Sequence, residues 1–324
     1  MIEASLLFVV GLIVLLAGAE GLVRGASSIA TRSNISPLVI GLTVVAFGTS
    51  MPELVVVITS IFDQSTDIGI GNIVGSNIAN ILIALGLAAM VGTLTVSQST
   101  YRKEIPFLIV ASIVLLVTSF DTVLGRGANT IDRFDGVLLL VLFTLFMGYI
   151  YTLSKRPEPI ATKLFQLFRF TPKTYSYLIS ISMTMAGLVG LVVGATLTVD
   201  GAETLARAAG LSELVIGLTV VAVGTSLPEL ATTLVAVYRR KSDLAIGNIV
   251  GSNLFNILWV IGVASVVSPI AISEALLLNI AIAAIAPIVL LVALTAGKMR
   301  LNRVGGLLLL ALYLAYVAYV VVGS

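Results

Sequence analysis

Long apolar stretches separated by short polar segments run through the whole chain. Five stretches carry no charged residue: 68–101, 174–199, 244–273, 275–297 and 304–324. Each is at least as long as the ~20 residues that a helix needs to cross the hydrocarbon of a bilayer. The pattern predicts an all-α membrane protein with ten transmembrane helices. We place them at 4–30, 37–60, 68–94, 104–120, 134–154, 174–206, 213–237, 244–267, 273–297 and 304–323.

The basic residues lie mostly in alternate connections between the predicted helices. Of the 18 lysines and arginines, 15 fall in odd-numbered connections, and only Arg126, Arg133 and Arg207 fall in even-numbered ones. Loops rich in lysine and arginine face the cytoplasm. We therefore expect a multi-pass protein of the plasma membrane with both termini outside. The first apolar stretch follows Glu3 and no basic residue, which favours a retained helix over a cleaved signal peptide.

Two segments of the chain occur twice, each pair 176 residues apart. Residues 38–54 and 214–230 agree at 15 of 17 positions, and 70–80 returns at 246–256. Five predicted helices per half is an odd number, so the second half enters the membrane from the opposite face. Such inverted repeats are common in secondary transporters. We expect a first five-helix repeat at 1–154 with its duplicated core at 37–94, a cytoplasmic linker at 155–173, and a second repeat at 174–324 with its duplicated core at 213–267.

Composition agrees with a membrane protein and narrows its chemistry. Hydrophobic residues make up 58% of the chain and charged residues 10%, too few for the surface of a soluble domain. The chain contains no cysteine and no histidine, which removes disulfides, thiolates and the commonest transition-metal ligand. We expect the lipid bilayer as its surroundings, no nucleic-acid partner, no resident cofactor, and function as a monomer.

Each duplicated segment carries one acid on a polar stripe of a predicted helix. In the first copy the stripe ends at Ser50 and Glu53, and in the second at Ser226 and Glu229. Residues three or four apart share a helix face, and a polar stripe on an apolar helix faces protein or water rather than lipid. The proline just before each acid removes a backbone donor, so we expect a broken helix at GTSMP and GTSLP. Freed carbonyls, hydroxyls and a carboxylate suit hard cations such as Ca²⁺ and Na⁺.

The second duplicated segment adds neutral oxygen donors. Asn72, Ser76 and Asn80 lie four residues apart, and Asn248, Ser252 and Asn256 repeat the spacing. The paired glycines of GNIVGSN allow two helices to approach closely. These helices are therefore expected to press against the helices that carry the acids.

The two acids have no fixed counter-charge in the sequence around them. No lysine or arginine occurs between Arg32 and Arg102, or between Arg207 and Arg239. A carboxylate at the centre of a bilayer costs at least ~2.5 kcal/mol. Protons or mobile cations must therefore compensate the acids, which is the chemistry of a cation exchanger.

Simpler roles exist for several of these side chains. Ser50 and Ser226 alone could cap or back-bond a helix, and Asn80 and Asn256 could only tie helices together. The matched pairs of hydroxyls, amides and acids favour the functional interpretation.

Other polar residues stay open or are interpreted as structural. Asn72 and Asn248 fit packing and ion binding equally well. Glu20, Asp200 and Glu203 are interpreted as solvated or snorkelling side chains near helix ends.

The segments GTSMPEL and GTSLPEL, each followed by GNIVGSN, resemble the two repeats of the cation/Ca²⁺ exchanger superfamily, most closely those of prokaryotic Na⁺/Ca²⁺ exchangers. The resemblance covers the whole chain and implies antiport without enzymatic activity. It implies that Glu53 and Glu229 hold Ca²⁺ together with the carbonyls of two threonines. Flanking Na⁺ sites would use four serines and two alanine carbonyls, and two asparagines would lie at the centre. The implied positions are Thr49, Thr225, Ser50, Ser226, Ser76, Ser252, Ala46, Ala222, Asn80 and Asn256.

The resemblance also bears on the coupling ion. Some relatives carry an aspartate where Asn256 stands, so K⁺ coupling is in doubt here. Proton-coupled relatives usually lack the serines of the GTS segments, which favours Na⁺ over H⁺. The implied mechanism is alternating access, with the helices at 4–30 and 174–206 sliding or rocking across the duplicated cores. A cation channel, or an intramembrane enzyme using two carboxylates, are the alternatives from other classes.

Overall fold

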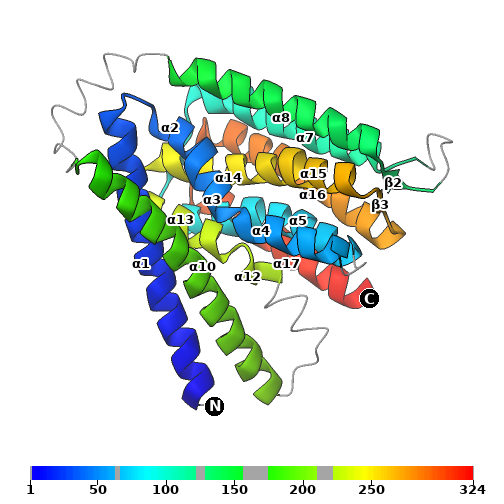
Figure 1. Cartoon of the computed structure of the whole chain (residues 1–324), viewed down its shortest axis with the longest axis horizontal. Helices are drawn as coiled ribbons and strands as arrows, with labels where there is room; N and C mark the ends of the chain where they lie inside the picture. Colours follow the sequence, from blue (N-terminus) through cyan, green and yellow to red (C-terminus); the bar gives the residue numbers. More distant parts are fainter. Residues whose placement is uncertain (1, 63–65, 122–127, 156–173, 210–221, 324) are drawn as a thin grey trace.

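The computed structural model of the chain describes residues 2–62, 66–121, 128–155, 174–209 and 222–323. Almost all of them are helical, as the hydrophobic pattern predicts (Figure 1). The principal helices are α1 (Ile2–Arg32), α4 (Met51–Phe62), α5 (Thr66–Ala79), α6 (Leu85–Val91), α7 (Ile105–Thr118), α8 (Arg133–Ser154), α10 (Tyr177–Ala208), α13 (Leu227–Tyr238), α14 (Ser242–Leu254), α15 (Ile261–Val267), α16 (Glu274–Ala296) and α17 (Arg303–Gly323).

Helices α1 and α10 form a long antiparallel pair that projects beyond the other helices (Figure 1). Glycines at seven-residue intervals line their contact. A Cβ atom on any of these glycines would lie 2.3–2.6 Å from an atom of the opposite helix, and most of those atoms are backbone. The two backbones therefore touch along most of their length. The glycines are Gly11, Gly18 and Gly25 on α1 and Gly187, Gly194 and Gly201 on α10.

The second predicted helix is broken, as its proline predicts. It begins at Pro37, where the hydroxyl of Ser36 caps it, and continues through α2 (Pro37–Ile40), a π-helical turn (Gly41–Val45) and α3 (Ala46–Thr49). Ser50 leaves the helical conformation with φ −86° and ψ 6°. The chain then bends by 42° into α4.

The same break occurs in the second copy. The short helix α12 (Ala222–Gly224) ends before Ser226, whose φ of −86° and ψ of 2° match those of Ser50. Helix α13 then starts with Pro228 in its first turn. The rest of the predicted helix at 213–237, before Ala222, lies outside the described residues.

Wider π-helical turns occur at matching places in the two halves. One follows α5 at Asn80–Ala84, and the other follows α14 at Phe255–Val260. Such turns are rare and often mark functional sites. Here they place Asn80 and Asn256 at irregular points of the two most enclosed spans, since 78% of the window in Ile68–Val91 and 83% of that in Ser242–Val267 is buried.

Two-residue strands, which the sequence analysis did not predict, connect the halves. β1 (Leu94–Thr95) pairs antiparallel with β4 (Arg300–Leu301), and β2 (Thr130–Ile131) pairs with β3 (Ile270–Ala271). Each pair joins the end of a buried span in one half to the segment before an outer helix of the other half. They fasten the two halves at two places.

Seven helices among the described residues are long and apolar enough to cross a membrane, and the bent pair Pro37–Thr49 and Met51–Phe62 makes an eighth. Helix α7 and the described part of the seventh predicted span, α13, are shorter. The count of ten spans therefore stays a prediction. The linker at 155–173 lies outside the described residues except for Lys155.

Candidate cation site

Glu53 and Glu229 lie just after the two helix breaks, in the first turns of α4 and α13. Both side chains are fully buried. They are close enough to interact electrostatically, so the fold brings the two acids of the duplicated segments to one place. The first turn of a helix carries unpaired N–H groups and a partial positive charge, which favours a carboxylate there.

A direct contact links the two copies at this place. The hydroxyl of Ser50 donates to Oε1 of Glu229 over 3.2 Å. The serine at one break thus touches the acid beyond the other break. Its counterpart Ser226 is buried, and its Oγ has no hydrogen-bond partner among the described residues.

Thr49 joins the first break to α14. Its Oγ1 lies 3.3 Å from Oδ1 of Asn248, from Oγ of Ser252 and from the carbonyl oxygen of Ala46. Ser252 also donates to the Ala46 carbonyl at 3.4 Å. Predicted oxygen ligands from both halves, Thr49 and Ala46 of the first and Ser252 of the second, therefore gather around a single buried point.

The equivalent cluster forms around Thr225 of the second half and again includes residues of both halves. Thr225 donates to Oδ1 of Asn72 at 3.0 Å, and its hydroxyl lies 3.2 Å from that of Ser76. Ala222 begins α12 close by in the sequence. Asn72 and Asn248, whose role the sequence left open, thus hold the threonines that precede the breaks.

Four asparagines form a further bridge between the halves. Asn80 donates to Oδ1 of Asn253 at 3.0 Å, and Asn256 donates to Oδ1 of Asn77 at 3.1 Å. Asn253 also donates to the carbonyl of Asn77 at 3.1 Å. Asn77 and Asn253 were not predicted from the sequence, because the prediction considered only the helix face on which residues four apart lie. The signal was present, since both belong to the repeated GNIVGSN.

Several buried oxygens at the site have no hydrogen-bond partner among the described residues. They include three carboxylate oxygens, two amide oxygens and one hydroxyl. Leaving one such acceptor unpaired costs about 1–3 kcal/mol, and a bound cation would satisfy several together. The atoms are Oε1 and Oε2 of Glu53, Oε2 of Glu229, Oδ1 of Asn80, Oδ1 of Asn256 and Oγ of Ser226.

No fixed cation neutralises the two acids in the described part of the chain. The ion pairs there join Glu20 to Arg24 and Arg239, and Glu203 to Arg207. The same residues contain no group of three or more acidic, histidine or cysteine side chains that could hold a metal ion by themselves, so any ion here would also need neutral oxygens. Two carboxylates surrounded by neutral oxygens fit a hard cation that arrives and leaves.

A cavity of about 410 Å³ lies between α10 and the two broken helices. Its wall is mostly apolar and includes Val56, Val199 and Asp200, and it reaches Thr225 and Pro228 beside the second break. The cavity thus lies beside the two breaks, and neither acid is among the residues that line it.

Comparisons with known proteins agree with this geometry. Residues 4–152 and 179–322 match the family described as sodium/calcium exchanger protein. The chain is 38% identical to the putative antiporter CaxA of Alkalimonas amylolytica over 98% of both chains. It is 36% identical to the inner membrane protein YrbG of Escherichia coli, over 83% of this chain and 81% of that protein. A solved structure of the sodium–calcium exchanger NCX_Mj superimposes with a TM-score of 0.82 at 33% identity, covering 98% of each chain.

The fold and the family are those of multi-pass membrane exchangers of cations, not those of enzymes. The chain belongs to the sodium/calcium exchanger family.

Proposed function

We propose that this protein is an antiporter that exchanges Ca²⁺ against Na⁺ across the plasma membrane by alternating access. The observation that carries the proposal is the pair Glu53 and Glu229, which are buried together and which have, among the described residues, no fixed counter-charge and several unpartnered oxygens. Either one Ca²⁺ or several Na⁺ ions would compensate the two negative charges. The two loads would compete for the same oxygens, which makes exchange obligatory.

In this proposal the ligands are those that the duplicated segments supply. Glu53 and Glu229 bind Ca²⁺ with the backbone carbonyls of two threonines, and the remaining donors form flanking Na⁺ sites and the centre. Their clustering in the structure supports this assignment. The additional donors are Thr49, Thr225, Ser50, Ser226, Ser76, Ser252, Asn80, Asn256 and the carbonyls of Ala46 and Ala222.

Na⁺ is favoured as the coupling ion by the hydroxyls at the two breaks. Ser50 already donates to Glu229, and Ser226 is buried with an oxygen that has no hydrogen-bond partner in the part of the chain that the structure describes. The exchanger NCX_Mj, which this chain resembles over nearly its whole length, was studied in crystals soaked with Na⁺ and Ca²⁺. Asn256 adds no third carboxylate, which argues against K⁺ as an additional coupling ion.

In the exchange cycle, α1 and α10 would move as one pair across the helices that hold the site. Their continuous backbone contact supports motion as a unit. Compensated acids lower the cost of passing through the occluded state, whereas two bare carboxylates oppose it. We propose that the termini face the outside and that a monomer completes the cycle.

The test is Ca²⁺ uptake into proteoliposomes that contain the purified protein. Outward gradients of Na⁺, H⁺ and K⁺ are applied separately. Na⁺ should drive uptake, and Glu53→Gln and Glu229→Gln should each abolish it. Uptake driven equally by H⁺ would favour the proton-coupled alternative, and flux without any counter-ion gradient would favour a channel.

A further inference from the structure

The two halves of the cation site are homologous but not equally supported. One turn beyond the second acid the sequence reads ELATT, whereas the first copy reads ELVVV. Thr233 therefore stands where the first half has Val57. Both side chains are buried, with 0% and 1% of their surface exposed.

Thr233 completes the hydrogen bonds of Asn248. The amide nitrogen of Asn248 donates to Oγ1 of Thr233 at 3.1 Å and to the backbone carbonyl of Glu229 at 3.3 Å. The amide oxygen of Asn248 accepts from Thr49 at 3.3 Å. A single side chain, held by Thr233, thus ties the backbone of one acid to the break of the opposite copy.

The counterpart of Asn248 lacks this support. Asn72 accepts from Thr225 at 3.0 Å, but its amide nitrogen is buried without a hydrogen-bond partner among the described residues. Val57 offers it no acceptor. Ser50 holds one oxygen of Glu229 at 3.2 Å, whereas the side chain of Ser76 approaches Glu53 without forming a hydrogen bond of regular geometry to either of its oxygens.

We propose that Thr233 is a positioning residue that makes the two half-sites unequal: it fixes the Glu229 half through Asn248 and leaves the Glu53 half free to adjust. The proposal rests on the proposed function. Ca²⁺ requires six to eight oxygens at tolerant distances. One carboxylate would be fixed and would set the affinity, and the other would adjust its position around each bound ion. Such a site would accept Ca²⁺ and Na⁺ in turn.

The experiment compares Thr233→Val with Thr233→Ser in Na⁺-driven Ca²⁺ uptake by proteoliposomes. Valine keeps the shape and removes one hydrogen bond, so KM for Ca²⁺ should rise about threefold to tenfold while kcat changes little. Serine restores the hydroxyl and should restore KM. Thr144→Val is the matched control, because Thr144 is exposed on α8 and bonds only its own helix at Leu140.

A reciprocal variant tests the unequal halves directly. Val57→Thr gives Asn72 the acceptor that Asn248 has, so the adjustable half becomes fixed. We expect kcat to fall about threefold or more while KM stays near the wild-type value.

Two further measurements separate positioning from folding. Melting temperatures with and without saturating Ca²⁺ show how strongly the ion stabilises each variant, and Thr233→Val should lose part of that shift. If Thr233→Val lowers the ion-free melting temperature but leaves KM and the Ca²⁺-dependent shift unchanged, Thr233 is only structural and the inference is wrong. If the wild-type protein shows no Na⁺-driven uptake, the proposed function fails and this inference falls with it.

Discussion

At the scale of single residues, Glu53 and Glu229 combine complete burial with the absence of a fixed positive partner in the described chain. A buried charge that lacks a partner destabilises the fold. The protein keeps both acids, so this destabilisation must be offset by something other than a charged side chain of the described chain. In the proposed function mobile cations offset this cost, so that the acids respond to whether an ion is bound as well as binding it.

Replacing either acid with glutamine tests this at the level of stability as well as transport. Glu53→Gln keeps the shape but removes the charge, so the ion-free protein should melt at a higher temperature. The melting temperature should then no longer rise with Ca²⁺, and exchange should fall at least about 100-fold. Thermal unfolding in detergent at several Ca²⁺ concentrations measures both effects. A variant that is less stable without ions and still stabilised by Ca²⁺ would contradict the assignment.

Asn77 is a residue at which structure and sequence analysis differ. Its Oδ1 accepts from Asn256 and its backbone carbonyl accepts from Asn253. We expect Asn77→Ala to lower the free energy of unfolding by about 1–3 kcal/mol, because it leaves the buried amide of Asn256 unpaired. Chemical unfolding followed by Trp259 fluorescence measures it, since Trp259 is the only tryptophan. If the unfolding midpoint of Asn77→Ala equals that of the wild type, the hydrogen bond between Asn77 and Asn256 contributes nothing to stability.

These asparagines show which contacts helical spacing predicts and which it does not. Helical spacing predicts which side chains share a face, and it grouped Asn72 and Ser76 on α5 with Asn80, which begins the π-helical turn directly after it. It does not predict which faces of two different helices meet across the inverted repeat. Asn77 bonds to Asn256 of the opposite half, a contact that only the tertiary fold creates.

At the scale of elements, the broken helices follow from local chemistry, and the sequence predicted them for that reason. Pro52 lacks the N–H that would bond the carbonyl of Gly48, so the helix bends at Ser50. The π-helical turns and the two-residue strands have no comparable local signal. They depend on how distant segments pack, as the pairing of Leu94 with Leu301 illustrates.

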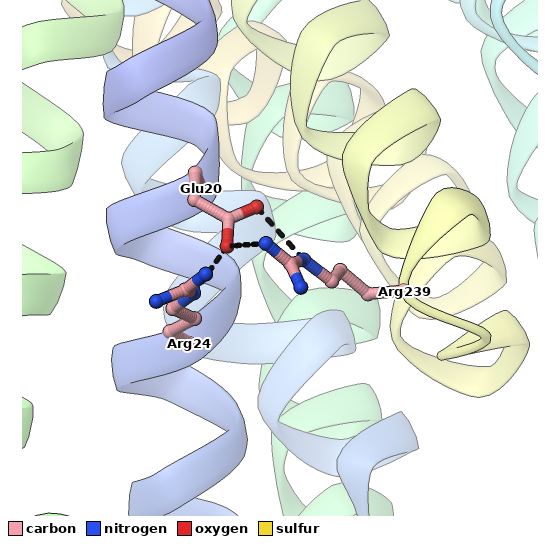
Figure 2. A network of polar contacts seen from close by, with 3 residues as sticks. All are labelled: Glu20, Arg24 and Arg239. Carbon is pink, nitrogen blue, oxygen red and sulfur yellow. Dashed lines mark hydrogen bonds and ion pairs between the residues drawn. The ribbon is translucent and has the colours of Figure 1, made fainter.

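Glu20 corrects the interpretation of one element. It lies within α1, twelve residues before the last residue Arg32, rather than near the end of the helix. Its carboxylate binds Arg24 on the same helix and Arg239 at the end of α13 (Figure 2). The contact to Arg239 is bidentate, with Nε at 3.0 Å from Oε2. It therefore fastens the α1–α10 pair to the helices of the site.

The glycine seam between α1 and α10 leads to a prediction about this pair. A Cβ on Gly194 would lie 2.3 Å from the backbone nitrogen of Leu15, which cannot move aside alone. Gly194→Ala should therefore force the helices apart and cost about 1–3 kcal/mol of stability. Gly148→Ala on α8 is the control, because nothing lies within 4 Å of its new methyl group and it should be neutral or stabilising. Equal melting temperatures for the two variants would mean that the seam is not closely packed.

At the scale of the whole molecule, the repeat relates the open cavity to a closed counterpart. Val56 lines the cavity. The equivalent residue in the second copy, 176 positions later, is Thr232, and its side chain is 0% exposed. The residue equivalent to Thr196, another wall residue, is Glu20 in the first copy. The contact between α1 and α13 is thus the counterpart of the interface between α10 and α4. The first interface is packed, whereas the cavity separates the helices of the second. The sequence predicted the inverted repeat but not which side would be open, since both copies carry nearly the same residues there.

The ion pair at Glu20 belongs to the closed side only. The positions that correspond to Glu20 and Arg239 in the other half are Thr196 and Asp63, which cannot form an ion pair. We therefore expect the contact between Glu20 and Arg239 to hold the predicted cytoplasmic side shut while the cavity faces outward. Exposed ion pairs contribute about 0.2–1 kcal/mol each, enough to shift a two-state equilibrium by up to about fivefold.

Because the chain contains no cysteine, single introduced cysteines can report which side is open. In inside-out and right-side-out vesicles, Val56→Cys should react with a membrane-impermeant thiol reagent from the outside, and Thr232→Cys should react slowly from the inside. Adding Glu20→Gln should raise the rate for Thr232→Cys about threefold to fivefold and lower that for Val56→Cys, because the latch that favours the outward-open state is lost. Glu203→Gln is the matched control, since Glu203 pairs with Arg207 on the same helix. If Glu20→Gln and Glu203→Gln act alike, the ion pair to Arg239 does not control access, and the difference between the two sides must come from the packing of α1 on α13 alone.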